Sequence, residues 1–166
     1  MRKPVSFALA VTAAAIATAT GVTVASAAPA ARSAASGTEY IQVMSASTAP
    51  GPASVIARGV FTAAGRVRLD DARVSTITFP GGTIVLSHRQ VHGSARFSPA
   101  SCLSLVRQSG SYRIVRGTGR YAGISGHGTY QLNLEIVGAR AGGRCSSARP
   151  PLAQQELLRL SGPVRR

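Results

Sequence analysis

The segment Gly117-Thr-Gly-Arg-Tyr-Ala-Gly-Ile-Ser-Gly-His-Gly-Thr-Tyr130 decides the fold class of this chain. It is dense in glycine, yet alternating strand-like segments flank it at 111–116 and 129–137. Glycine adopts positive φ angles without a Cβ clash, so such a run lets a chain leave one strand, turn tightly and begin the next. We expect Gly119 or Gly123 to adopt a positive φ angle, and Tyr121 to pack its ring against one end of the fold. The architectural motif comprises Gly117, Gly119, Tyr121, Gly123, Gly126 and Gly128.

The first six residues of this segment also fit the G-x-G-x-x-G/A fingerprint of dinucleotide-binding folds. That fingerprint requires a helix next, because the helix N-terminus holds the pyrophosphate. Three further glycines follow instead, and glycine in a helix interior costs up to about 1 kcal/mol per residue. We therefore interpret the segment as a turn, and we expect no cofactor.

Strand signals recur along the rest of the chain and are separated by glycine and proline turns such as Pro80-Gly81-Gly82. Short strands at this spacing predict an all-β sandwich or barrel. The segment 152–160 is compatible with a helix or a strand, and we expect a final strand that closes a barrel. The expected strands are 40–45, 54–63, 66–70, 73–79, 83–92, 94–97, 102–107, 111–116, 129–137 and 155–160.

The N-terminus has the features of a secretory signal peptide over residues 1–27. A basic start, Met1-Arg-Lys-Pro, precedes an uncharged apolar run over 5–24 and the site Ala25-Ser26-Ala27. The alternative is a membrane anchor, but the run consists mainly of weakly apolar alanine and threonine. We expect cleavage before Ala28, a flexible tail over 28–38, one all-β domain over 39–166, and a secreted protein with no membrane span after cleavage.

The two cysteines, Cys102 and Cys145, are expected to form a disulfide, because export places them in an oxidising compartment. The closed loop contains the whole glycine segment, which the crosslink should restrain. The alternative is a catalytic or metal-binding thiol pair, but no histidine cluster with ligand spacing lies nearby.

The chain is strongly basic, with a formal charge of +14 that includes Arg2 and Lys3 of the signal peptide. The remainder has seventeen arginines against five acids, hence a charge of +12. The arginines are dispersed singly, and few aromatic residues lie among them. This pattern favours a diffuse solvated surface over a nucleic-acid site, and such a surface attracts anionic envelope polymers.

The few candidate residues for metal or ligand binding are histidines. His88 and His92 lie in the alternating pattern Ile84-x-Leu86-x-His88-x-Gln90-x-His92, which predicts one face of a strand. No third ligand is visible, so no metal site is predicted. In the expected strand 129–137, Tyr130 lies on the apolar face. Because successive side chains alternate between faces, Glu135, five residues later, points to the opposite, outer face. This leaves His88 as the only inward titratable group and a weak candidate for ligand binding.

Two further polar residues, His127 and Ser125, lie within the glycine segment. His127, between two glycines, is expected on a turn or at a strand start. Ser125 follows Gly123-Ile124, which lacks the spacing of a nucleophile elbow, so we assign no catalytic residue.

The run Gly117-Thr-Gly-Arg-Tyr-Ala-Gly123 resembles the glycine-threonine-glycine, aromatic, glycine signature of barrels related to allene oxide cyclase and dirigent proteins. The chain also resembles exported actinobacterial barrel proteins over 55–61, 79–88, Cys102, Cys145 and 160–163. The resemblance implies that the domain over 39–166 is a β-barrel domain rather than a sandwich, with a single antiparallel, calycin-like barrel of about eight strands. No catalytic residue of the plant enzymes matches a position in this chain.

Three functions are compatible with these features. The leading expectation is a secreted, disulfide-linked barrel that binds a small apolar ligand in its lumen or an anionic envelope surface through its arginines. The alternatives are a cyclase-like or dirigent-like enzyme and a structural envelope protein.

Overall fold

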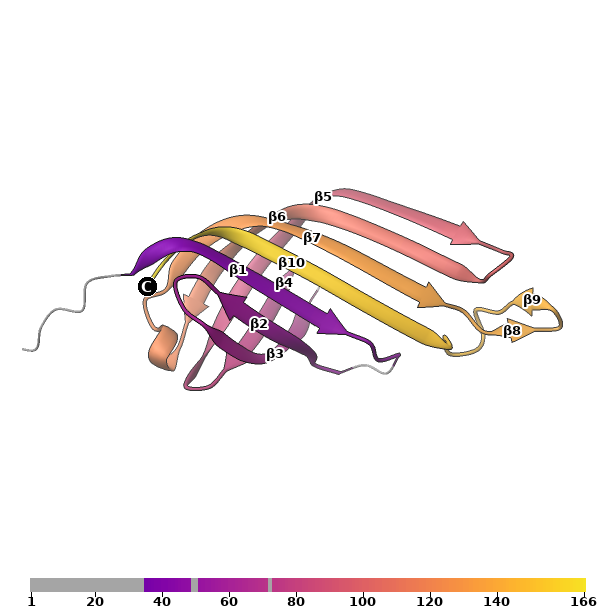
Figure 1. Ribbon diagram of the computed structural model, residues 1–166, viewed down its shortest axis with the longest axis horizontal. Coiled ribbons are helices and arrows are strands. Elements are labelled where there is room, and N and C mark those ends of the chain that lie inside the picture. Colours follow the sequence, from indigo (N-terminus) through magenta and orange to yellow (C-terminus); the bar gives the residue numbers. More distant parts are fainter. Residues whose placement is uncertain (1–34, 49–50, 72) are drawn as a thin grey trace, which may run out of the picture. The chain divides into compact units, whose positions relative to one another are not determined.

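The computed structural model describes residues 35–48, 51–71 and 73–166. Eight antiparallel strands form a closed barrel in the order β1-β10-β7-β6-β5-β4-β3-β2 (Figure 1). This confirms the predicted fold class. The predicted signal peptide and most of the tail lie outside the described residues. The elements are β1 (Ser36–Ser45), β2 (Ala53–Arg58), β3 (Ala63–Asp71), β4 (Val74–Phe79), β5 (Gly82–Ser98), β6 (Leu103–Gly117), the 3-10 turn η1 (Gly119–Tyr121), β7 (Ser125–Val137), β8 (Arg140–Ala141), β9 (Arg144–Cys145) and β10 (Ala153–Arg165).

The strand boundaries differ from the expected ones most clearly in β2, β5 and β6. The expected strand 54–63 is broken after Arg58, where Gly59 has a φ of 141° and the chain turns into β3. Conversely, β5 and β6 each join two expected strands, because they pair with each other almost without interruption from Ile84 to Ser98. Local glycines therefore do not end a strand where a long partner continues beside it.

The C-terminal segment is a strand, as expected, and it closes the barrel. β10 pairs with β1 on one side and with β7 on the other. Its pairing with β1 begins at Ser36, three residues before the expected domain boundary at Glu39. Two-sided pairing removes the exposed edges that a strand would otherwise present.

The core lies inside the barrel and follows the alternation of each strand. In β1, Glu39, Ile41 and Val43 are buried, whereas Tyr40 and Met44 are exposed. An aromatic cluster fills one end of the barrel and consists of Phe61, Phe79 and Tyr121. Their ring centroids lie 5.2–5.7 Å apart in tilted or edge-on pairs, a geometry that aromatic rings favour.

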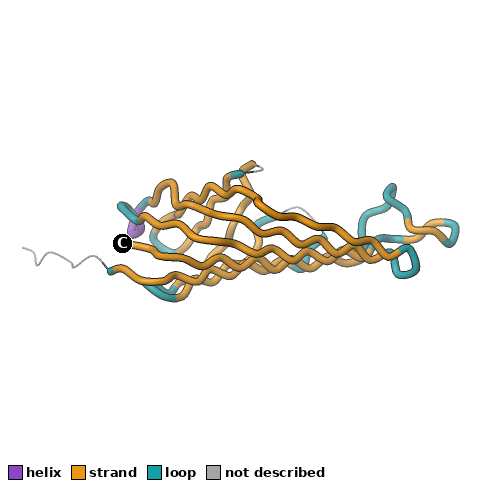
Figure 2. The backbone as a smooth tube through the Cα atoms, turned by 90° about the horizontal axis from the view of Figure 1, so that it is seen from above, coloured by secondary structure: helices purple, strands orange, loops and turns teal. Residues whose placement is uncertain are grey.

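Four strands continue beyond the other end of the barrel. β4 pairs with β5 only as far as Ser87, whereas β5 pairs with β6 as far as Ser98. β5, β6, β7 and β10 thus form an extension that leads to the small hairpin of β8 and β9 (Figures 1 and 2). Across the part of the chain described above, no helix is long and apolar enough to cross a membrane.

Candidate functional site

The glycine segment is a compact turn, and its predicted backbone geometry is confirmed. Gly119 and Gly123 have φ angles of 58° and 80°. Between them η1 makes a single 3-10 turn, and Tyr121 within it is 2% exposed. The Arg120 amide donates a 2.8 Å hydrogen bond to the Gly81 carbonyl, which ties the turn to the start of β5. A strand follows at once, so the helix that a dinucleotide site needs does not form there.

The start of β7 differs from the expectation. β7 begins at Ser125, so Gly126 and Gly128 are strand residues rather than turn residues. His127 is the third residue of that strand and is exposed, in agreement with the prediction of a strand start.

The barrel lumen is the candidate site. It contains a cavity of about 290 Å³ on the side away from the aromatic cluster. The cavity walls come from strands around the barrel and include Gly51 of the β1–β2 connection. The apolar lining comprises Val43, Ala53, Val67, Leu69, Ile77, Leu86, Leu132, Leu158 and Leu160, and the polar lining comprises Ser75, His88, Gln108, Tyr112, Tyr130 and Glu156.

Glycines beside the two lumen tyrosines make room for their rings. A Cβ on Gly128 would lie 2.7 Å from a ring carbon of Tyr112, and a Cβ on Gly110 would lie 2.8 Å from a ring carbon of Tyr130. Both distances are far below an ordinary contact between carbon atoms. The small residues therefore determine how the tyrosines line the cavity.

His88 lies in the lumen, as predicted. It is half-buried and contacts the Tyr130 ring edge-on, with 6.0 Å between ring centroids. His92 does not share its face. A β-bulge between Gln90 and His92 shifts the register, so that His88 pairs with Tyr112 but His92 pairs with Ser109. Because a shift by one residue reverses the face of a strand, the prediction of one shared face is wrong.

The prediction that His88 is the only inward titratable group is also wrong. Glu39 is completely buried among the core residues of β1, and Glu156 lines the cavity from β10. Each acid lies two residues before an apolar residue of the same strand, in Glu39-x-Ile41 and Glu156-x-Leu158, and so shares its face. That alternation could have identified them in the sequence. Glu135 is exposed on β7, as predicted.

Glu39 and Tyr112 are buried polar residues of the barrel interior. Glu39 Oε2 accepts a 3.2 Å hydrogen bond from the backbone amide of Phe61. Within the described chain, Glu39 Oε1 and the Tyr112 hydroxyl have no hydrogen-bond partner. Burial raises the pKa of Glu39, since it disfavours the charged carboxylate. Burial, and then the charge of Glu39, raise the pKa of Tyr112 to about 12.

We expect Glu39→Gln to stabilise the protein more at pH 7 than at pH 4. The folded pKa of Glu39 lies above the ordinary value of 4.5. At a pH between the ordinary pKa and the higher pKa of the folded state, folded Glu39 holds a proton that the unfolded chain has lost. Rising pH through this range therefore lowers the free energy of unfolding. Glutamine removes this penalty and keeps an acceptor for the Phe61 amide. Urea unfolding of both proteins at the two pH values measures the difference.

The matched control for this prediction is Glu135→Gln, which removes one carboxylate from the exposed face of β7. The difference in unfolding free energy between Glu135→Gln and the wild type should not show the rise from pH 4 to pH 7 that we expect for Glu39→Gln. A Glu39→Gln protein that is destabilised equally at pH 4 and pH 7 would contradict the assignment of Glu39 as a buried acid with a raised pKa.

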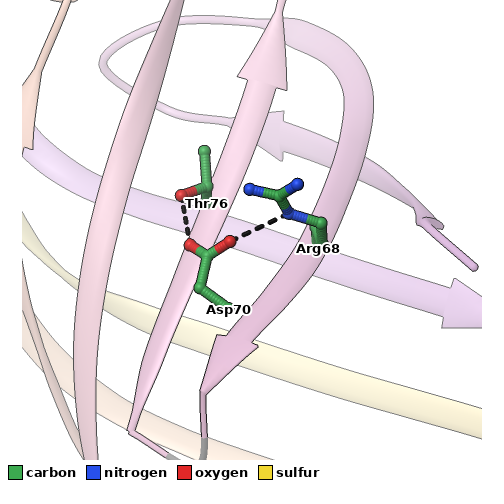
Figure 3. A network of polar contacts seen from close by, with 3 residues as sticks. All are labelled: Arg68, Asp70 and Thr76. Carbon is green, nitrogen blue, oxygen red and sulfur yellow. Dashed lines mark hydrogen bonds and ion pairs between the residues drawn. The ribbon is translucent and has the colours of Figure 1, made fainter.

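The outer wall carries the positive charge. All described arginines are exposed except Arg166, which is half-buried over the Tyr121 ring. Arg68 alone among the described arginines forms an ion pair with an acid, at 2.9 Å from Asp70 (Figure 3). Thr76 also donates a hydrogen bond to Asp70. The Thr76 hydroxyl, and to a smaller extent Arg68, lower the pKa of Asp70.

The predicted disulfide between Cys102 and Cys145 is confirmed, but it does not restrain the glycine turn. It joins the β5–β6 turn to the β8–β9 hairpin. The glycine turn lies at the opposite end of β6, which is 15 residues long. At about 3.3 Å per residue, the strand separates the two features by more than 40 Å. The bridge therefore fastens the far end of the extension.

Comparisons with known proteins add no constraint on this site. No family model, no curated protein and no solved structure matches the chain. Within the described ranges, no group of three or more His, Cys, Asp or Glu side chains could hold a metal ion. What the lumen does must therefore be inferred from its own residues.

Proposed function

We propose that this protein is a secreted barrel that binds a small, largely apolar ligand in its lumen. The observation that carries the proposal is the cavity of about 290 Å³, with mainly apolar walls and a few convergent polar groups. Ligand pockets typically begin at roughly 300 Å³ and have this composition. The aromatic cluster closes one end of the barrel, so a ligand would enter from the end that bears the extension.

Secretion is part of the proposal and rests on two features. The N-terminal 27 residues have the charge, apolar run and cleavage site of a signal peptide. The disulfide between Cys102 and Cys145 is of the kind that persists in oxidising compartments. Both features suit a protein that functions outside the cytoplasm.

The resemblance to allene oxide cyclase and dirigent barrels supports a lumen site, because those proteins guide a reactive intermediate inside a barrel. A cyclase-like or dirigent-like enzyme is accordingly the alternative function. Binding of an anionic envelope polymer by the exposed arginines is a second form of the binding role.

The proposal is tested with the neutral apolar dye N-phenyl-1-naphthylamine, whose fluorescence rises on transfer to an apolar site. We expect saturable binding to the wild type and strongly reduced binding to Leu158→Trp, because the larger side chain fills the lumen. Leu157→Trp is the matched control, since the adjacent residue faces the opposite side of β10 and is half-buried to a similar degree.

Equal dye binding by both tryptophan variants would contradict the lumen site. Overpacking of this kind typically costs about 1–3 kcal/mol, so a thermal melt of each variant must accompany the titration. Dye binding that Leu158→Trp leaves intact would place the apolar site elsewhere on the protein, for instance on the extension.

A further inference from the structure

The ionisable side chains of the lumen differ in kind from those of the outer wall. No described arginine is among the residues that line the cavity, although arginine provides the strong excess of positive charge on the outside. The ionisable residues of the cavity wall are His88, Tyr112, Tyr130 and Glu156. Glu39 is completely buried in the barrel interior and is not among the residues of the cavity wall. Two of the five acids of the chain thus face inward, with no arginine beside them on the cavity wall.

Glu156 occupies the part of the lumen nearest the extension. Its neighbours in register are Ser45 on β1 and Leu134 on β7, and Leu158 is the next inward residue on its own strand. It is half-buried. No hydrogen bond or ion pair joins its side chain to another residue within 35–48, 51–71 and 73–166.

A carboxylate in this position is incompletely solvated and has no neutralising partner. Burial raises the pKa of Glu156, which shows that its surroundings disfavour the charged form. A cation placed beside it would relieve that cost and form a charge-assisted hydrogen bond. An anionic group placed there would meet like charge in a poorly screened site.

The remaining polar lining suits the same kind of ligand. Gln108 offers an amide oxygen, and Tyr130 offers a ring to which a cation is attracted. The apolar lining residues would enclose a hydrocarbon body at the same time. The cavity therefore combines an apolar chamber with acceptors for hydrogen bonds and positive charge.

From this arrangement we infer that the lumen selects amphiphiles whose apolar body ends in a protonated amine, with Glu156 as the residue that binds the ammonium group. The inference rests on the proposed lumen function and specifies its ligand class. The arginines of the outer wall oppose the approach of a cation, but salt screens this repulsion beyond about 8 Å at physiological ionic strength.

The inference is tested by calorimetric titration of the mature protein with three eight-carbon probes that carry different head groups: 1-octylamine, 1-octanol and octanoate. The measurements are made at neutral pH, where the alkylamine is protonated as lysine is, and at about 0.15 M salt. We expect the ammonium probe to bind about tenfold more tightly than the alcohol, as a hydrogen bond to a charged group implies. Octanoate should bind most weakly.

Two isosteric variants assign the preference to one residue. Glu156→Gln should reduce the advantage of octylamine over octanol to within about twofold while octanol still binds. Glu135→Gln is the matched control, because it removes the same charge from the outer face of β7, beside β10, and should leave the order unchanged.

The outcomes separate this inference from the proposed function. If wild-type protein binds octanol as tightly as octylamine, or if Glu156→Gln retains the preference, the inference is overturned and the lumen site stands. If none of the probes binds, or if Leu158→Trp leaves the binding of all three unchanged, the lumen site itself is refuted.

Discussion

Replacement of Tyr121 by alanine is expected to lower the free energy of unfolding by about 3–5 kcal/mol. The ring is 2% exposed and packs between Phe61 and Phe79 at the closed end of the barrel. Alanine would leave a cavity where the β2–β3 connection, β4 and the glycine turn meet, and Arg166 would lose the ring that it covers. Chemical denaturation of the two proteins measures the difference.

His127→Ala is the control for this prediction. His127 belongs to the same glycine segment but is exposed, so its removal should change stability by less than about 0.5 kcal/mol. If the segment instead served as a ligand loop, the order would reverse. A Tyr121→Ala protein as stable as the wild type would refute the architectural role that we assign to the turn.

Replacement of both Cys102 and Cys145 by serine is expected to destabilise the protein by about 4 kcal/mol on the chain-entropy argument. The bridge closes a loop with a sequence separation of 43, and loops of this length constrain the unfolded chain by roughly that amount. Urea unfolding of oxidised wild type and the double variant provides the comparison. A loss below about 1 kcal/mol would show that the closed loop contributes little.

The position of the disulfide predicts which segments lose protection from hydrogen exchange when it is removed. Hydrogen exchange should accelerate at the β8–β9 hairpin and the β5–β6 turn, which the bridge joins. The glycine turn should be unaffected, because Tyr121 and the hydrogen bond from Arg120 to Gly81 hold it independently. Faster exchange at Tyr121 with an unchanged hairpin would contradict this assignment.

Local sequence patterns were sufficient for the fold class and for several of its parts. Alternation of apolar and polar residues with a period of two predicts strands, because successive side chains of a strand point to opposite faces. The spacing of glycines around Tyr121 gives a turn, because positive φ angles such as those of Gly119 and Gly123 exclude most other residues. Two cysteines in a chain with the features of a secreted protein indicate a disulfide, whichever strands carry them.

The tertiary structure alone decided which polar groups share the lumen. Alternation within each strand places Glu39 and Glu156 on apolar faces, but the two residues lie more than a hundred residues apart in sequence, and only the pairing of β10 with β1 brings both faces to one lumen. His92 leaves the face of His88 because one extra residue is accommodated as a bulge opposite β6. Pairing between distant strands fixes register, and register determines the face of every side chain. The local pattern gives the face of a residue within its own strand, but not which faces of distant strands enclose one lumen.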